Sequence, residues 1–205
     1  MFYKIVRPIL MLFMLIFYPR KIYGKENLPE NKDRLVIVCN HFGKIDVFFV
    51  GSIFKGKTYF LAKRELFEKK LYNKIIRSLG GIPVMRDSVD LDCIREGLKA
   101  LKSDHRLAIF PEGRRNLENE ELQPLKPGAA MFAFKSKAPI VPVIIEKKAH
   151  LFKKAKLYIG KPLYLDEYFG RPYNTELNNA LNDKVREIML ETQKELREML
   201  KARKK

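Results

Sequence analysis

The sequence predicts a single α/β domain in which helices flank a largely parallel central sheet. Short, continuously apolar segments alternate along the chain with longer segments of helical periodicity, which is typical of α/β proteins. The length of 205 residues suits one domain with its own hydrophobic core. Because neither an internal repeat nor a Pro-, Gly- or Ser-rich linker interrupts this alternation, we expect no second folded domain.

Five apolar segments are predicted to be buried strands. Their apolar character is continuous rather than alternating, as expected for strands that helices cover on both faces. They are LVIVC (35–39), TYFLA (58–62), GIPVM (81–85), LAIF (107–110) and IVPVII (140–145). A later segment, KLYIGKPL (156–163), is predicted to form an edge strand.

Helices are predicted between these strands, at residues 47–54, 70–79, 88–102 and 128–137. Ser88 is the predicted N-cap of the third, because apolar residues follow it at helical spacing. From Thr175 onward, a further apolar stripe at helical spacing leads to the basic sequence KARKK. We expect this C-terminal stretch to pack on the domain as an amphipathic helix with a solvated basic tail, and contact of the tail with a membrane is the alternative.

The N-terminal residues 1–21 are predicted to form a membrane-associated helix, and residues 22–205 the folded domain. An apolar run of eleven residues, 8–18, has two basic residues on each side. This run is too short to span a bilayer, which takes about 20 residues, and no small-residue cleavage site follows it. We expect an interfacial helix whose apolar face enters one leaflet while its cations meet lipid phosphates. A helix packed in the core is the alternative.

The chain is strongly basic, with 41 Lys and Arg against 24 Asp and Glu and a formal net charge of +17. Such an excess predicts an anionic partner. The apolar N-terminus favours an anionic membrane surface, whereas the scattered lysines argue against nucleic acid. We therefore expect a monotopic or peripheral protein on the cytoplasmic face of the cell membrane.

The two cysteines, Cys39 and Cys93, form no C-x-x-C pair, which indicates a reducing compartment. The sequence contains no P-loop, dinucleotide-binding glycine pattern or metal-ligand cluster. Because Cys39 lies close to His41, an acyl-enzyme formed on this thiol is an alternative to be considered, although a cysteine at a strand end is usually an apolar filler.

Polar residues follow three of the predicted strands. They are His41 after the first strand, Arg86 after the third, and Glu112, Gly113, Arg114 and Arg115 after the fourth. In parallel sheets the loops at the carboxyl ends of the strands form the ligand site, so these side chains are expected to converge at one edge. Asp46 follows His41 by five residues, a spacing that also fits an ordinary loop histidine.

Four blocks of the sequence, in order, resemble the glycerolipid acyltransferases, the family typified by 1-acyl-sn-glycerol-3-phosphate acyltransferase. The blocks are NHFGKID, GGIPVMR, FPEGRRN and APIVPV. The resemblance covers about residues 22–162, and LKPGAA with Lys126 is a further, weaker match. Three positions depart from the family pattern: Gly43 replaces the usual serine, Lys44 adds a cation, and Arg114 replaces a threonine.

The resemblance implies an enzyme that moves a fatty acyl group from acyl-CoA or acyl carrier protein to the free hydroxyl of 1-acyl-sn-glycerol 3-phosphate, forming phosphatidic acid. It implies His41 and Asp46 as catalytic residues, and no metal or cofactor. The implied phosphate-binding residues are Arg86, Glu112, Gly113 and Arg115, with Arg114 and Lys126 as additional candidates. Alternatives are another lysophospholipid or glycerol 3-phosphate as acceptor and, in a different class, a non-catalytic basic module that binds membranes or nucleic acid.

The residue types suit this chemistry. Imidazole accepts protons near neutral pH, so His41 can take the proton of the attacking hydroxyl while Asp46 stabilises the imidazolium. Guanidinium groups bind phosphate in a bidentate manner. Each residue also has a structural alternative: surface cations for the arginines, a salt bridge or an orienting contact for Glu112, and a tight turn for Gly113.

Overall fold

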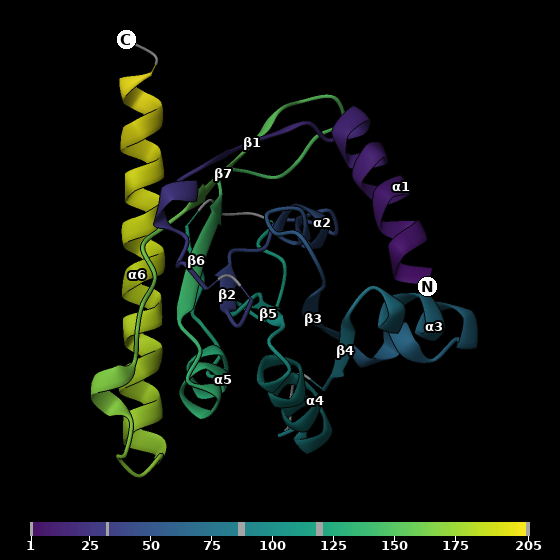
Figure 1. Cartoon of the computed structure of the whole chain (residues 1–205). Coiled ribbons are helices and arrows are strands. Elements are labelled where there is room, and N and C mark those ends of the chain that lie inside the picture. Colours follow the sequence, from purple (N-terminus) through teal and green to yellow (C-terminus); the bar gives the residue numbers. More distant parts are fainter. Residues whose placement is uncertain (1, 32, 86–88, 118–120, 204–205) are drawn as a thin grey trace.

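The computed structural model describes residues 2–31, 33–85, 89–117 and 121–203, and a seven-stranded sheet of order β1-β7-β6-β2-β5-β3-β4 lies at its centre (Figure 1). The strands are β1 (Arg20–Tyr23), β2 (Val36–Cys39), β3 (Thr58–Lys63), β4 (Gly81–Val84), β5 (Arg106–Ile109), β6 (Ile140–Ile145) and β7 (Ala155–Ile159). The neighbours β6, β2, β5, β3 and β4 all run parallel. β7 is antiparallel to β6, and β1 is parallel to β7. The predicted α/β class with a largely parallel sheet is confirmed.

Six α-helices and three short 3₁₀ helices connect and cover the described strands. The α-helices are α1 (Phe2–Phe17), α2 (Asp46–Gly51), α3 (Lys70–Ser78), α4 (Leu91–Lys102), α5 (Ala129–Ser136) and α6 (Thr175–Ala202). The 3₁₀ helices are η1 (Lys25–Asn27), η2 (Arg64–Phe67) and η3 (Asp166–Tyr168). All the predicted helices therefore form, with shifts of a few residues at their ends.

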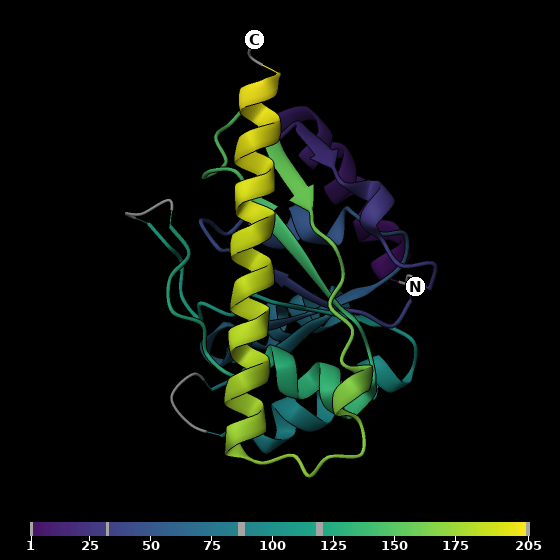
Figure 2. The ribbon, with the colours of Figure 1, turned by 90° about the vertical axis from the view of Figure 1, so that its left-hand side faces the viewer.

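The sheet separates two hydrophobic clusters, as expected for strands that are apolar on both faces. One cluster joins α4, α5 and α6 to side chains such as Val36, Val38 and Leu107. The other joins α1 and α2 to the opposite faces of the same strands, through Ile37 and Ala108. Figures 1 and 2 show α6 along one side of the domain, α4 and α5 below the sheet, and α2 above it. This burial holds the carboxyl ends of β2 and β5 rigidly side by side.

Three details differ from the sequence predictions. The prediction that residues 156–163 form an edge strand is wrong, because β7 lies inside the sheet between β6 and β1. β1 itself carries two cations in four residues and was not predicted as a strand. Helix α4 begins at Leu91, and the side chain of Asp90 caps it by accepting a hydrogen bond from the Cys93 amide. The predicted cap Ser88 lies outside the described residues.

The N-terminal helix α1 packs on the domain by one face only. Met14 is buried in the cluster with α2, and the Arg7 guanidinium donates a hydrogen bond to the Phe54 carbonyl at 2.8 Å. The outer face exposes large apolar side chains: Ile9, Leu12, Phe13, Leu15 and Ile16. Within the described part of the chain, no helix has the length and apolar character needed to cross a bilayer. An exposed apolar helix face of this size indicates a surface that something else covers.

Candidate active site

The candidate site lies where β2 and β5 end. The two strands are parallel neighbours, paired from Val36 with Leu107 to Val38 with Ile109. His41 follows β2 and Glu112 follows β5, so the topology places both loops at the same edge of the sheet. Two hydrogen bonds join the loops. The His41 amide donates to Glu112 Oε1 at 2.9 Å, and the Asn116 amide donates to the His41 carbonyl at 2.6 Å. The predicted convergence of these two segments is therefore present.

His41 and Asp46 are hydrogen-bonded. The distance from His41 Nδ1 to Asp46 Oδ2 is 3.0 Å, and Asp46 is fully buried in the first turn of α2. The chain between them folds as a tight turn in which the amides of Phe42 and Gly43 donate to the same carboxylate oxygen, at 2.6 and 2.7 Å. Three donors on one oxygen fix the carboxylate and, through it, the ring. Since the carboxylate accepts from Nδ1, the protonated nitrogen is Nδ1 and Nε2 is the basic one.

The second oxygen of Asp46, Oδ1, is buried without a hydrogen-bond partner among the described residues. Gly43 lies beside it, and a Cβ placed on Gly43 would be 3.9 Å from Oδ1, an ordinary contact. The space next to Asp46 therefore accepts a side chain, and packing does not require the glycine that replaces the serine of the family pattern.

Glu112 is buried beneath His41, and its carboxylate is fully engaged by the protein. Besides the His41 amide on Oε1, the Gln123 amide donates to Oε2 at 3.2 Å, and the Asn116 side chain lies 3.5 Å from Oε2. Burial raises the pKa of Glu112 above its usual value, while the hydrogen bonds from these groups act in the opposite direction. Glu112 thus connects the β2 loop with the segments around Asn116 and Gln123.

Two further residues shape the site, and sequence reasoning missed both. The ring of Phe110 stacks on His41 with a centroid distance of 4.2 Å. The side chain of Asn40 is buried and pairs with the backbone of Ile145, accepting from its amide at 2.8 Å and donating to its carbonyl at 3.0 Å. Asn40 thereby extends the β2–β6 pairing beyond the last strand residue and anchors the backbone next to His41. Its place directly before His41 in the NHFGKID block was the available signal.

Of the predicted phosphate-binding cations, Arg114 and Arg115 lie on the loop after β5, and Lys126 borders the pocket of His41. Arg114 and Arg115 are exposed; Arg114 Nε donates to Gln123 Oε1 at 2.8 Å, and Arg115 has no partner among the described residues. Gly113 has a φ of +68°, its amide donates to the Phe110 carbonyl in a turn, and a Cβ there would lie 2.9 Å from Lys126 Cδ. Gly113 therefore allows Lys126 to lie against this turn. Arg86 lies outside the described residues, two beyond the end of β4.

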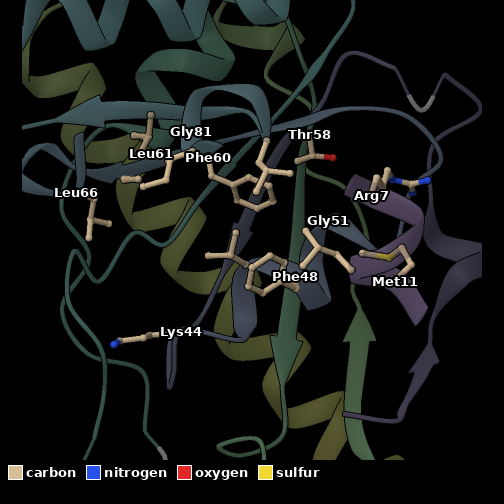
Figure 3. Close-up of a pocket in the computed structure, with 15 residues that line it drawn as sticks. Arg7, Met11, Lys44, Phe48, Gly51, Thr58, Phe60, Leu61, Leu66 and Gly81 are labelled. Carbon is tan, nitrogen blue, oxygen red and sulfur yellow. The ribbon is translucent and has the colours of Figure 1, made fainter. Parts of the chain in front are cut away.

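Two apolar pockets adjoin the site, on opposite faces of the sheet. One, of about 510 Å³, is bordered by His41, Asp90 and Lys126, by Gly113 and Gly128, and otherwise by apolar side chains of β3, β4, β5, α4, α5 and the segments that adjoin them. The other, of about 250 Å³, lies between α1, α2 and β3. Figure 3 shows Lys44 and Leu66 at one end of this second pocket and Arg7 and Met11 at the other. Leu61 borders both pockets.

The cysteines do not supply a nucleophile. Cys39 is buried in the cluster with α2. Burial raises the pKa of the Cys39 thiol well above its usual range, and the carboxylates of Asp46 and Glu112 raise it further. Burial likewise raises the pKa of Cys93 to about 12. Both thiols are therefore protonated at neutral pH. Among the described residues, no three His, Cys, Asp or Glu side chains group as metal ligands would.

The parallel sheet, the paired histidine and aspartate at its edge and the adjoining apolar pockets fit an acyltransferase. The profile of the Acyltransferase family matches residues 19–146, and the chain belongs to this family.

Comparisons with individual proteins agree with this family assignment. The chain is 35% identical, over 177 residues, to the 1-acyl-sn-glycerol-3-phosphate acyltransferase of Bacillus subtilis, a match that covers 82% of this chain and 87% of that one. The enzyme of the same name from Streptococcus pneumoniae is 29% identical over 89% of this chain and 67% of its own. The fold is similar to the crystal structure of the 1-acyl-sn-glycerophosphate acyltransferase PlsC from Thermotoga maritima, with a TM-score of 0.63 at 24% identity over 92% of this chain and 79% of that one.

Proposed function

We propose that this protein transfers a fatty acyl group from a thioester donor, acyl-CoA or acyl carrier protein, to the free hydroxyl of 1-acyl-sn-glycerol 3-phosphate, producing phosphatidic acid for phospholipid synthesis. The observation that carries the proposal is the bond between His41 and a fully buried Asp46 at the edge of an apolar pocket, in a chain of the Acyltransferase family. The activity in the names of its relatives, such as the Bacillus subtilis enzyme, supports the same substrate.

The reaction uses the substrate hydroxyl as nucleophile. His41 Nε2 accepts the hydroxyl proton as the oxygen attacks the thioester carbonyl carbon, and Asp46 stabilises the imidazolium that forms. The tetrahedral intermediate then expels the thiolate, breaking the C–S bond, and the imidazolium returns the proton to sulfur. The products are the new ester and a free thiol. These reaction steps use no metal or cofactor.

The cations at the edge of the site are assigned to the acceptor phosphate. Arg115 and Arg114 are exposed on the loop that follows β5, and Lys126 borders the pocket of His41. Arginine side chains bind phosphate oxygens through paired N–H groups, and several cations favour a doubly charged phosphate over a zwitterionic head group. Arg86, two residues after the end of β4 in the sequence, completes the proposed set. The apolar walls of the His41 pocket suit an acyl chain.

Glu112 is assigned a positioning role. Its two oxygens accept hydrogen bonds from the amides of His41 and Gln123, so it holds the backbone of the base and is not available to a phosphate anion.

We expect the Glu112→Gln variant to lower kcat roughly tenfold to a hundredfold while the KM for the acceptor stays within about twofold, because glutamine replaces one acceptor oxygen by an NH₂ group that faces a buried amide donor. Steady-state thiol release at varied acceptor concentrations measures both constants. The matched control is Glu121→Gln, at an exposed position nearby whose side chain makes none of these contacts. A large rise in KM with unchanged kcat would assign Glu112 to the substrate instead.

Membrane association is assigned to the exposed face of α1. Its apolar side chains continue into the 151–152 turn, where Phe152 lies 5.6 Å from the ring of Phe17, and both Leu151 and Phe152 are exposed. Burial of such side chains in one leaflet, with the net positive charge of the chain against anionic lipid, suits a monotopic or peripheral protein of the cytoplasmic face.

Thiol release tests the activity. Purified protein is mixed with acyl-CoA or acyl carrier protein and with 1-acyl-sn-glycerol 3-phosphate, lysophosphatidylcholine or glycerol 3-phosphate, and free thiol and lipid products are measured. The expected result is release that depends on the acceptor and is fastest with 1-acyl-sn-glycerol 3-phosphate. Faster release with another acceptor would reassign the substrate, and no release with any acceptor and either donor would refute the enzymatic proposal.

A further inference from the structure

Helix α3 has an apolar face that the protein covers only in part. Residues 71, 72, 75 and 76 (Leu, Tyr, Ile and Ile) share one side of the helix at helical spacing, and the basic residues share the other. An amphipathic helix normally buries its apolar face, yet no residue of α3 is buried. Leu71 is 68% exposed and Tyr72 57%. Leu66, in the preceding η2, is 52% exposed. These three residues are called the α3 patch below.

Lysines that form no ion pair among the described residues lie on α3 and directly before it. Lys69, Lys70 and Lys74 are exposed and form no ion pair with any described residue. By contrast, Arg77 on the same helix pairs with Glu96 at 3.0 Å. Three lysines without an ion-pair partner in the described part of the chain, on or directly before the helix that carries exposed leucine and tyrosine side chains, suit contact with a bilayer, because its surface is anionic and its interior is apolar.

The position of α3 adds a second argument. Leu66 and Ile76 border the apolar pocket between α1, α2 and β3, and Arg7 and Met11 of α1 border its other end (Figure 3). Both helices lie on the side of the domain away from α6, with the start of α1 close to α3 (Figure 1). The exposed face of α1 and the α3 patch therefore flank one pocket.

We propose that α3 lies in the interface of an anionic bilayer, with the α3 patch among the acyl chains and the three lysines on lipid phosphates, as a second membrane contact beside α1. This inference rests on the proposed membrane association and extends it. A single interfacial helix leaves the domain free to rotate about that helix. Contacts on both sides of the pocket fix one orientation, in which the pocket opening faces the bilayer.

The chain contains no tryptophan, so Tyr72→Trp introduces a single fluorescent probe in the α3 patch. We expect its emission to shift to the blue when vesicles of phosphatidylglycerol and phosphatidylcholine are added, and lipids brominated in the acyl chains to quench it. Tyr164→Trp is the matched control, because Tyr164 is similarly exposed, at 53%, and lies in the segment after β7, outside the patch. Its emission should not change.

Sedimentation with the same vesicles measures the contribution to binding. The double variant Leu71→Ser with Tyr72→Ser should bind at least tenfold more weakly, whereas Leu190→Ser with Tyr164→Ser should bind as the unmodified chain does. Lys69→Gln, Lys70→Gln and Lys74→Gln should each weaken binding to anionic vesicles roughly fivefold and leave binding to neutral vesicles unchanged. Thiol release in detergent, which needs no vesicle surface, should be the same for all these variants and verifies their folding.

The possible results separate this inference from the proposed function. If the unmodified protein does not sediment with vesicles, the proposed membrane association is itself wrong. If it sediments but the tryptophan at position 72 neither shifts nor is quenched, α1 alone binds and the inference about α3 is overturned. A shift caused by acyl carrier protein and not by vesicles also overturns it, and assigns the α3 patch to the donor protein.

Discussion

Alanine in place of His41 is expected to lower kcat for acyl transfer by roughly 10³-fold, within the range of 10²–10⁴ that a positioned general base contributes. The ring has no substitute, because Asp46 is buried behind it and the nearest thiol, Cys39, is buried and protonated. Binding of the acceptor does not depend on the imidazole, so its KM should change little. Thiol release at varied acceptor concentrations measures both constants.

The matched control is His105→Ala. His105 lies at the start of β5, at the opposite end of the sheet from the site, and stacks on Tyr59 with a centroid distance of 5.5 Å. The kcat of this variant should stay within about twofold of the kcat of the unmodified enzyme. Unchanged turnover in His41→Ala would mean that another group takes the hydroxyl proton, and the assignment of the base would have to be abandoned.

The predicted strands correspond to the observed ones because their apolar character is a local property of the sequence. Five continuous apolar runs became the five parallel strands β2, β3, β4, β5 and β6. β1 was missed for the opposite reason. Its sequence RKIY is half charged, and it becomes a strand by pairing with β7, more than 130 positions away, from Arg20 with Ala155 to Tyr23 with Tyr158. The same pairing places β7 inside the sheet, which its own sequence does not indicate.

In the candidate site, too, the local features could be predicted from the sequence and the long-range contacts could not. The spacing of His41 and Asp46 was visible in one short segment, and the turn that brings them together is also local, since the amides of Phe42 and Gly43 stabilise it. The residues that hold this segment in place act across the sheet. Asn40 pairs with Ile145, 105 positions away, and Glu112 accepts from the His41 amide, 71 positions away. Such contacts depend on the strand order, which a single sequence does not reveal.

Asparagine in place of Asp46 is expected to lower kcat by about 10³- to 10⁴-fold, although the two side chains have nearly the same shape. Asp46 Oδ2 accepts three hydrogen bonds, from His41 Nδ1 and the amides of Phe42 and Gly43. If the asparagine oxygen takes this place, the three bonds remain, but the charge that stabilises the imidazolium is lost and an NH₂ group is buried at the former Oδ1. If the amide turns round, its NH₂ group faces three donors, and the histidine must adopt the wrong tautomer.

Both orientations of the asparagine impair the same step, proton acceptance by His41, so the loss should appear in kcat with little change in the KM for the acceptor. Asp183→Asn, at an exposed position on α6, is the matched control for the loss of one carboxylate and should leave kcat unchanged. Thermal unfolding separates catalysis from folding, since the buried NH₂ group also costs about 1–3 kcal/mol of stability, and assays well below the melting temperature of the variant remove that contribution. If folded Asp46→Asn enzyme retained more than a tenth of the kcat, Asp46 would serve the turn alone, and His41 would act without a buried carboxylate partner.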